Sequence, residues 1–235
     1  MSKEKKLTPA QREKKQQAAE ARKQAQKKSK YKTLIIACTA ILLVILAAVM
    51  LATVLSDLNK GDGATLETAV ATHIAKIDIQ DYGTITLELY GKTAPISVRN
   101  FVTLAKSGFY NGLNFHRIID GFMMQGGAPN ENSPTLTPIP GEFSTNGYVN
   151  NLLHKRGVIS MARSSVLDSA TSQFFIMQAD KTHLDGKYAA FGMVIDGIEI
   201  VDAICADATP TDGNGSIAAD QRPVILSVTV TRVKK

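Results

Sequence analysis

The feature that most constrains this chain is a run of 24 residues without a charged side chain. It extends from Thr33 to Ser56 and consists mainly of Leu, Ile, Val and Ala. As a helix that rises ~1.5 Å per residue, residues 34–55 would be about 33 Å long, enough to cross a hydrocarbon core of ~30 Å. We therefore predict one transmembrane helix over residues 34–55.

Two other interpretations of this run stay open. One is a helix buried in a soluble protein, and the other is a cleaved signal peptide. A signal peptide usually has an apolar core of about 7–15 residues and a small-residue cleavage site. This run is longer, and no convincing site of that kind precedes Ser56. The sequence favours an uncleaved anchor.

The basic residues are concentrated before the apolar run. Residues 1–33 hold 12 Lys and Arg against 3 Asp and Glu, a net charge of +9, whereas the whole chain carries +6. The remainder is therefore mildly acidic, which argues against a nucleic-acid-binding domain. Positive charge flanks the cytoplasmic end of most membrane helices. This rule predicts a cell-membrane protein with a cytoplasmic tail, residues 1–33, and an extracytoplasmic domain.

The rest of the chain is predicted to be a tethered domain that its core alone stabilises. Residues 56–72 are small, polar and Gly-containing, which is typical of a linker. The two cysteines cannot pair, because Cys38 lies inside the apolar run and Cys205 lies far along the domain. A domain over residues 73–235 is long enough to fold without a disulfide.

From His73 onward, short strand patterns alternate with two helical patterns. The predicted strands span residues 73–80, 84–90, 113–118, 122–125, 157–162, 173–178, 190–195 and 224–233. The predicted helices span residues 95–107, with Thr93 as N-cap and Gly108 just past the end, and 197–206. The long stretch 128–156 is expected to be functional or well packed. These elements favour a mainly β domain, a closed barrel with helices over its openings.

Residues 115–127, FHRIIDGFMMQGG, predict a binding groove. They place Arg117 among Phe115, Phe122 and Met123, with Gln125 close by in the sequence. An apolar pocket with one guanidinium and one amide at its rim suits a neutral, peptide-like ligand better than a phosphate or a metal. We expect no metal and no cofactor, because the four His lack metal-ligand spacing. We expect no nucleophilic serine, because no GxSxG elbow is present.

Residues 73–235 resemble the cyclophilin-type peptidyl-prolyl isomerases. The matching blocks, in order, are NFV, GFY and FHR within 100–117, GFMMQGG at 121–127, GVISMA at 157–162, SQFFI at 172–176, and HLDGKY and FG within 183–192. The resemblance implies an eight-stranded antiparallel barrel capped by two helices. It also implies that the partners are proline-containing polypeptides, and we expect a monomer.

The resemblance assigns roles to individual residues. Arg117 is implied to be catalytic. The implied substrate-binding residues are Phe122, Met123, Gln125, Ala162, Arg163, Gln173, Phe175, His183, Leu184 and Tyr188. His183 stands where many members have Trp, so we expect no tight cyclosporin binding, and Tyr188 stands where many have His. Arg163 replaces a frequent Asn, and we expect an effect on specificity there.

The chemistry implied for Arg117 is physically reasonable. Rotation about an X–Pro bond meets a barrier of about 18–20 kcal/mol from amide resonance, and it breaks no bond. A permanently charged guanidinium can donate a hydrogen bond to the prolyl nitrogen as the amide twists. We predict an isomerase that assists the folding of exported proteins. The alternatives are a non-catalytic chaperone that binds proline segments and a scaffold whose tail recruits partners.

Overall fold

The computed structural model describes residues 39, 41–51 and 63–234. The chain divides into two units, Met1–Leu58 and Asn59–Lys235. The predicted tail 1–33, much of the predicted anchor 34–55 and the start of the linker 56–72 lie outside the described residues. Within the described part of the first unit, Thr39 and residues 41–51 are helical and exposed. Among the described residues, no helix has both the length and the hydropathy that a membrane crossing needs.

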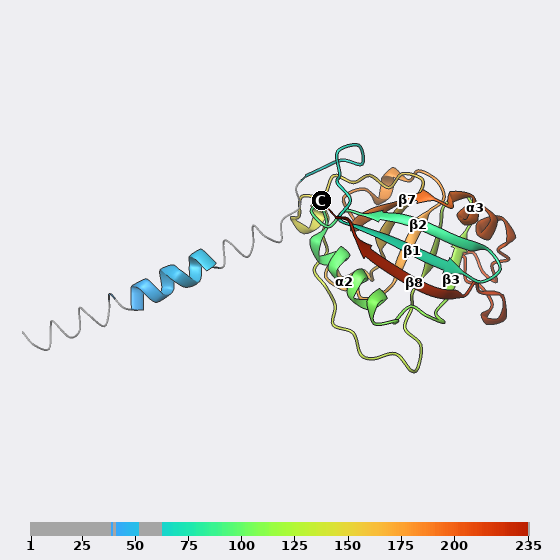
Figure 1. Ribbon diagram of the computed structural model, residues 1–235, viewed down its shortest axis with the longest axis horizontal. Coiled ribbons are helices and arrows are strands. Elements are labelled where there is room, and N and C mark those ends of the chain that lie inside the picture. Colours follow the sequence, from blue (N-terminus) through green and yellow to red (C-terminus); the bar gives the residue numbers. More distant parts are fainter. Residues whose placement is uncertain (1–38, 40, 52–62, 235) are drawn as a thin grey trace, which may run out of the picture. The chain divides into compact units, whose positions relative to one another are not determined.

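The second unit is built on one antiparallel sheet of eight strands (Figure 1). The strands are β1 (His73–Ile79), β2 (Gly83–Leu89), β3 (Phe115–Ile119), β4 (Met123–Gly126), β5 (Val158–Met161), β6 (Phe174–Met177), β7 (Ala190–Asp196) and β8 (Ile225–Arg232). Their order across the sheet is β3-β4-β6-β5-β7-β2-β1-β8. The predicted mainly β fold with eight antiparallel strands is confirmed, and each end lies within two residues of its predicted position.

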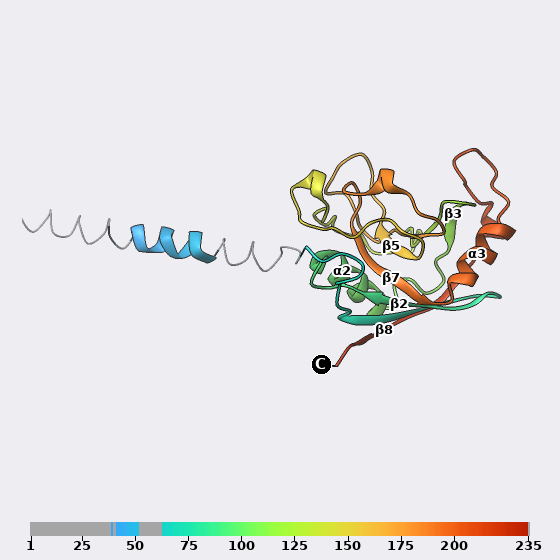
Figure 2. The same cartoon turned by 90° about the horizontal axis from the view of Figure 1, so that it is seen from above.

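The sheet curls, and its two end strands meet where β3 and β8 begin. An isolated bridge joins Asn114 and Val224. The amide of Phe115 donates to the carbonyl of Pro223 at 3.0 Å. The amide of Ile225 donates to the carbonyl of Leu113 at 2.7 Å. The two predicted helices are also present, α2 (Pro95–Lys106) against β8 and α3 (Ile198–Asp207) against β2 and β4. Figures 1 and 2 show them near opposite ends of the strands.

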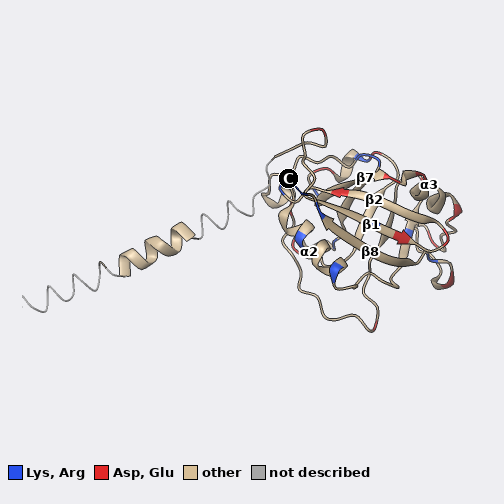
Figure 3. Cartoon of the chain, viewed as in Figure 1, with Lys and Arg blue, Asp and Glu red and all other residues tan. Residues whose placement is uncertain are grey.

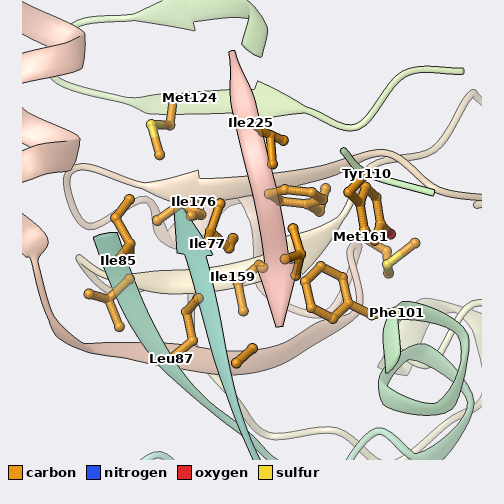
Figure 4. Packing of buried hydrophobic residues seen from close by; sticks show 14 of the residues in the cluster. Ile77, Ile85, Leu87, Phe101, Tyr110, Met124, Ile159, Met161, Ile176 and Ile225 are labelled. Atoms are coloured by element: carbon orange, nitrogen blue, oxygen red, sulfur yellow. The ribbon is translucent and has the colours of Figure 1, made fainter. Parts of the chain in front are cut away.

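The main hydrophobic core fills the space inside the curled sheet (Figure 4). Phe101 of α2 lies at its centre, with ring centroids 5.2 Å from Tyr110, 5.5 Å from Phe174 and 5.5 Å from Phe191. All four rings are fully buried. Burying an aromatic side chain stabilises a fold by roughly 1.5–3 kcal/mol, so this group alone is a large part of the core.

The beginning of α2 differs from the sequence prediction. Thr93 is not the N-cap: the cap position falls on Ala94, which has no side-chain acceptor for the amides of the first turn. The free amides of the first turn find a distant partner instead. The carboxylate of Glu142 accepts from the amides of Ile96 at 2.8 Å and Ser97 at 2.7 Å.

Gly108 ends α2 as predicted. Its φ of +74° is unfavourable for other residues, and the amide of Phe109 donates back to the carbonyl of Leu104 at 3.0 Å. This pattern satisfies carbonyls that a helix end otherwise leaves without partners.

Candidate functional site

One row of cross-strand neighbours runs across four strands and forms the base of the site. Arg117 of β3 pairs with Gln125 of β4, Gln125 with Phe175 of β6, and Phe175 with Ser160 of β5. Directly opposed residues of paired strands place their side chains on the same face. This face is opposite to the one that Phe174 presents to the main core.

Alternation along the strands separates core residues from site residues. In β4, Met124 joins the main core, whereas Met123 belongs to a second, smaller hydrophobic cluster. In β6, Phe174 joins the main core and Phe175 the second cluster. The second cluster therefore forms an apolar base for the site on the outer face of the sheet.

A cavity of about 220 Å³ opens over this base. Its lining residues are Arg117, Phe122, Met123, Gln125, Ala162, Arg163, Phe175, Leu184 and Tyr188. Each of these nine was predicted from the sequence to bind substrate or catalyse its rotation. The volume is below the range of about 300–1,000 Å³ that is usual for drug-sized ligands. A cavity of this size suits one compact side chain with its adjoining peptide groups.

The remaining two predicted residues lie beside the cavity rather than in its lining. Gln173 accepts a hydrogen bond at its Oε1 from Nε2 of Gln125 at 3.0 Å, so the two amides form one polar group. His183 is exposed, and its ring centroid is 5.9 Å from that of Phe122. Both positions are within reach of a peptide that extends beyond the cavity.

Arg117 is held by a loop that the sequence did not reveal as part of the site. Its Nε donates to the carbonyl of Asn214 at 2.7 Å, and its Nη1 lies 3.8 Å from Sδ of Met123. The loop is itself stabilised by Asp212, which accepts from the amides of Asn214 at 2.9 Å and Ser216 at 3.0 Å. This arrangement fixes the stem of Arg117 and leaves its terminal nitrogens at the cavity.

Arg163 lines the cavity from the side opposite β3 in the strand order. Its Nε and Nη2 donate to the carbonyl of Lys187 at 2.9 and 2.8 Å, and its Nη1 donates to that of Ser164 at 2.8 Å. Its guanidinium carbon lies 5.1 Å from the ring centroid of Phe143 and 4.7 Å from that of Tyr188. The guanidinium is therefore fixed by carbonyls and aromatic rings.

A buried chain of hydrogen bonds lies beneath Phe175. Nδ1 of His154 is 3.0 Å from Oδ1 of Asp185, and Nε2 is 3.2 Å from Oγ of Ser160. The imidazole stacks on Phe175, with centroids 5.9 Å apart and planes inclined by 17°. Burial lowers the pKa of His154, so at neutral pH the ring is uncharged, with one nitrogen donating to Asp185 and the other accepting from Ser160.

Asp185, His154 and Ser160 are hydrogen-bonded in the same succession as the triad of a serine hydrolase, but the serine is not accessible to a substrate. Ser160 is fully buried within β5, and His154 is 1% exposed. No substrate can reach the hydroxyl, so nucleophilic catalysis remains unsupported. The stacking geometry indicates a supporting role, in which His154 holds the ring of Phe175 from below. Ser160 follows His154 by six residues, but Asp185 is 31 residues away from His154, and no motif links the three.

Elsewhere in the described residues, charged and metal-ligating side chains do not gather into a metal site. In the part of the chain that the structure describes, no group of three His, Cys, Asp or Glu could hold a metal ion. Basic residues lie on α2, an acidic residue lies on β2, and β1 carries one of each (Figure 3). Burial raises the pKa of the Cys205 thiol to about 12, which leaves it unreactive at neutral pH.

Comparisons with known proteins agree with this geometry. A family model described as cyclophilin type peptidyl-prolyl cis-trans isomerase/CLD matches residues 74–234. A peptidyl-prolyl cis-trans isomerase of Acinetobacter baylyi is 43% identical over 159 residues, which are 64% of this chain and 82% of that protein. Peptidyl-prolyl cis-trans isomerase A of Dickeya dadantii is 42% identical over 177 residues, 72% of this chain and 87% of that protein.

A solved structure is similar over the same domain. It is a cyclophilin-type isomerase of Cryptosporidium parvum, crystallised in the presence of the dipeptide Ala-Pro. The TM-score is 0.58 at 27% identity, and the match covers 67% of this chain and 98% of that one.

Proposed function

This chain belongs to the cyclophilin-type peptidyl-prolyl cis-trans isomerase family, and on that premise we propose that its 220 Å³ cavity binds the proline ring while Arg117 catalyses the rotation. Relatives that share about two-fifths of the aligned residues are named for this activity, and the chain is an enzyme of the same class. The assignment of individual residues is our proposal.

The observation that supports this assignment best is the placement of Arg117. Its Nε donates to the carbonyl of Asn214, and its Nη end reaches Met123 at the wall of the cavity. When an X–Pro amide twists, resonance is lost and the prolyl nitrogen gains a lone pair that can accept a hydrogen bond. A guanidinium that donates to it binds the twisted amide better than the planar one, which lowers the barrier.

The apolar and amide residues have separate tasks in this proposal. Phe122, Met123, Phe175 and Leu184 grip the ring, so that only the other side of the bond turns. The paired amides of Gln125 and Gln173, together with the main chain of Ala162 and Arg163, bind the peptide backbone. None of these steps forms or breaks a covalent bond.

An exchange measurement on a proline peptide tests the role of Arg117. We expect Arg117→Ala to lower kcat/KM about 100- to 1,000-fold, the usual effect of losing one donor to a transition state. Arg117→Lys keeps the charge but not the fork of donors, and we expect a smaller loss. Unchanged far-UV circular dichroism is the control for folding. Full activity in Arg117→Ala would remove this residue from the mechanism.

The same experiment separates the enzyme from a non-catalytic chaperone. A chaperone that holds proline segments would bind the peptide in NMR titrations without accelerating exchange, and both variants would behave like the wild type in the exchange measurement.

We also propose that residues 34–55 anchor the chain in the cell membrane, with residues 1–33 in the cytoplasm and the isomerase outside it, where it acts on exported proteins. The support is the charge-free run and the charge asymmetry around it. Exposed large side chains along residues 41–51 would also be more stable in lipid than in water. The test is membrane fractionation with and without residues 34–55, followed by protease accessibility of the domain in intact cells. A fully soluble wild-type chain would contradict the anchor.

Finally, we propose that the domain works as a monomer whose sheet behaves as a closed barrel with α2 and α3 over its openings. The bridge between Asn114 and Val224 supports closure. Light scattering tests the monomer, and slow amide exchange at Phe115 and Ile225 tests the closure.

A further inference from the structure

The cavity has two guanidinium groups in its lining and no carboxylate. Arg117 and Arg163 are its charged lining residues, and they come from segments on either side of the row that Gln125 and Phe175 form. One guanidinium is sufficient for the proposed catalysis, because the twisting amide offers one prolyl nitrogen. The second guanidinium has no part in that step.

Among the described residues, the charge of Arg163 has no ionic partner. The ion pairs of the described residues are His154 with Asp185, Lys155 with Asp180 and Arg156 with Asp202, and Arg163 is in none of them. Its hydrogen bonds to the carbonyls of Lys187 and Ser164 orient the group without neutralising it.

Carboxylates in neighbouring segments are occupied elsewhere. Asp168 accepts from the amide of Gly141 and from Asn146, and Asp185 accepts from the amide of His154. Arg163 therefore keeps a positive charge at a fixed place on the wall of the cavity. A charge of this kind acts on any ionised group that a bound peptide brings near it.

We propose that Arg163 makes this enzyme select proline peptides that carry a carboxylate, an Asp or Glu side chain, within two residues of the proline. This rests on the proposed function of the cavity as the proline site. At ~7 Å and an effective dielectric constant of ~40, the attraction between unit charges corresponds to about sevenfold in kcat/KM. Arg163 attracts a Glu and repels a Lys at the same peptide position, so both effects contribute to the ratio of kcat/KM between the two peptides. Salt screening weakens both effects. At ~0.1 M salt, where the Debye length is about 10 Å, screening roughly halves both energies, and we expect a Glu-to-Lys ratio of about ten.

A purely structural role for Arg163 predicts a different result. The side chain joins the segments of Phe143, Ser164 and Lys187, so its loss could loosen the cavity for every substrate alike. In that case kcat/KM would fall by a common factor, and the ratio between acidic and basic peptides would stay as in the wild type.

The experiment uses the full chain in detergent and NMR exchange on a host peptide, Gly-Ala-Ala-Pro-Ala-Ala-Gly. One position at a time, before or after the proline, is changed to Glu, Gln or Lys. The variants are Arg163→Gln, which removes the charge, and Arg163→Lys, which keeps it. Lys76→Gln on β1 is the matched control, because it removes one exposed positive charge on a strand that does not line the cavity.

At one or more peptide positions we expect a Glu-to-Lys ratio of about ten in the wild type, in Arg163→Lys and in Lys76→Gln. In Arg163→Gln the ratio should fall to about two, and 0.5 M NaCl should reduce it in the wild type. A wild-type ratio near one, or an unchanged ratio in Arg163→Gln, would overturn the proposal. Absence of exchange for every peptide would instead contradict the proposed function itself.

Discussion

At the scale of single residues, the site combines a part that the sequence predicted and a part that it could not. Arg117, Phe122 and Gln125 fall in one short motif, and the period of two along a strand separates Phe174 from Phe175. The supports of Arg117 and Phe175 have no such signal, because Asn214 and His154 reach the site from loops far away in the sequence. Arg117 is bound by the backbone carbonyl of Asn214, and every residue type has such a carbonyl. The residue type at position 214 therefore does not indicate this contact.

Replacing the buried His154 should destabilise the fold. His154→Phe removes both hydrogen bonds and leaves the hydroxyl of Ser160 without a partner in the core. An unsatisfied buried polar group costs about 1–3 kcal/mol, so the free energy of unfolding should fall by that amount in urea titrations. Combining His154→Phe with Ser160→Ala should recover part of the loss. A double variant less stable than either single variant would contradict the coupling.

At the scale of elements, the loop that holds Arg117 should affect catalysis more than stability. Asp212 organises the turn that presents the Asn214 carbonyl, and it lies on the surface. We expect Asp212→Ala to lower kcat/KM on the order of tenfold, because small misplacements of a catalytic group are costly. Asp220→Ala, an exposed carboxylate in the nearby 3-10 helix, is the matched control. Equal losses in kcat/KM for both variants would rule out a specific role for the turn.

The start of α2 shows why element boundaries are harder to predict than elements. The helical stripe and Pro95 predicted the helix, but its capping carboxylate comes from Glu142 in the long loop. That loop was expected to be functional or well packed; residues 141–143 are buried in it, whereas residues 129–138 are mostly exposed. A local rule such as Thr at the N-cap cannot anticipate a partner more than forty residues away.

The Glu142 cap predicts a measurable loss of stability. Glu142→Ala leaves the amides of Ile96 and Ser97 buried without an acceptor, and we expect about 1–3 kcal/mol less free energy of unfolding. Glu142→Gln keeps one acceptor and should lose less. Burial raises the pKa of the Glu142 carboxyl, so the fold disfavours its charged form relative to the unfolded chain. The difference between the wild type and Glu142→Gln should therefore shift in favour of the wild type as the pH falls toward 4.5.

At the scale of the whole molecule, the number of strands and their alternation followed from the sequence, but the pairing did not. Neighbours such as β2 and β7, or β1 and β8, are joined across long intervals of chain. Their register depends on which side chains fill the common interior, and that is a property of the assembled sheet. The family resemblance supplied this long-range arrangement, which periodicity alone leaves open.

The pH dependence of unfolding tests the domain as a unit. Burial lowers the pKa of His73, His116 and His154 below the ordinary value of 6.5. On unfolding, each regains its ordinary pKa, so below about pH 6.5 the unfolded chain binds more protons than the fold. The free energy of unfolding should therefore be highest above pH 7 and should fall progressively as the pH drops toward 5. The urea midpoint measures this, and in His154→Gln the fall should be shallower, because the most deeply buried of the three no longer titrates. A midpoint that is constant from pH 7 to pH 5 would mean that these rings are as easily protonated in the fold as in water.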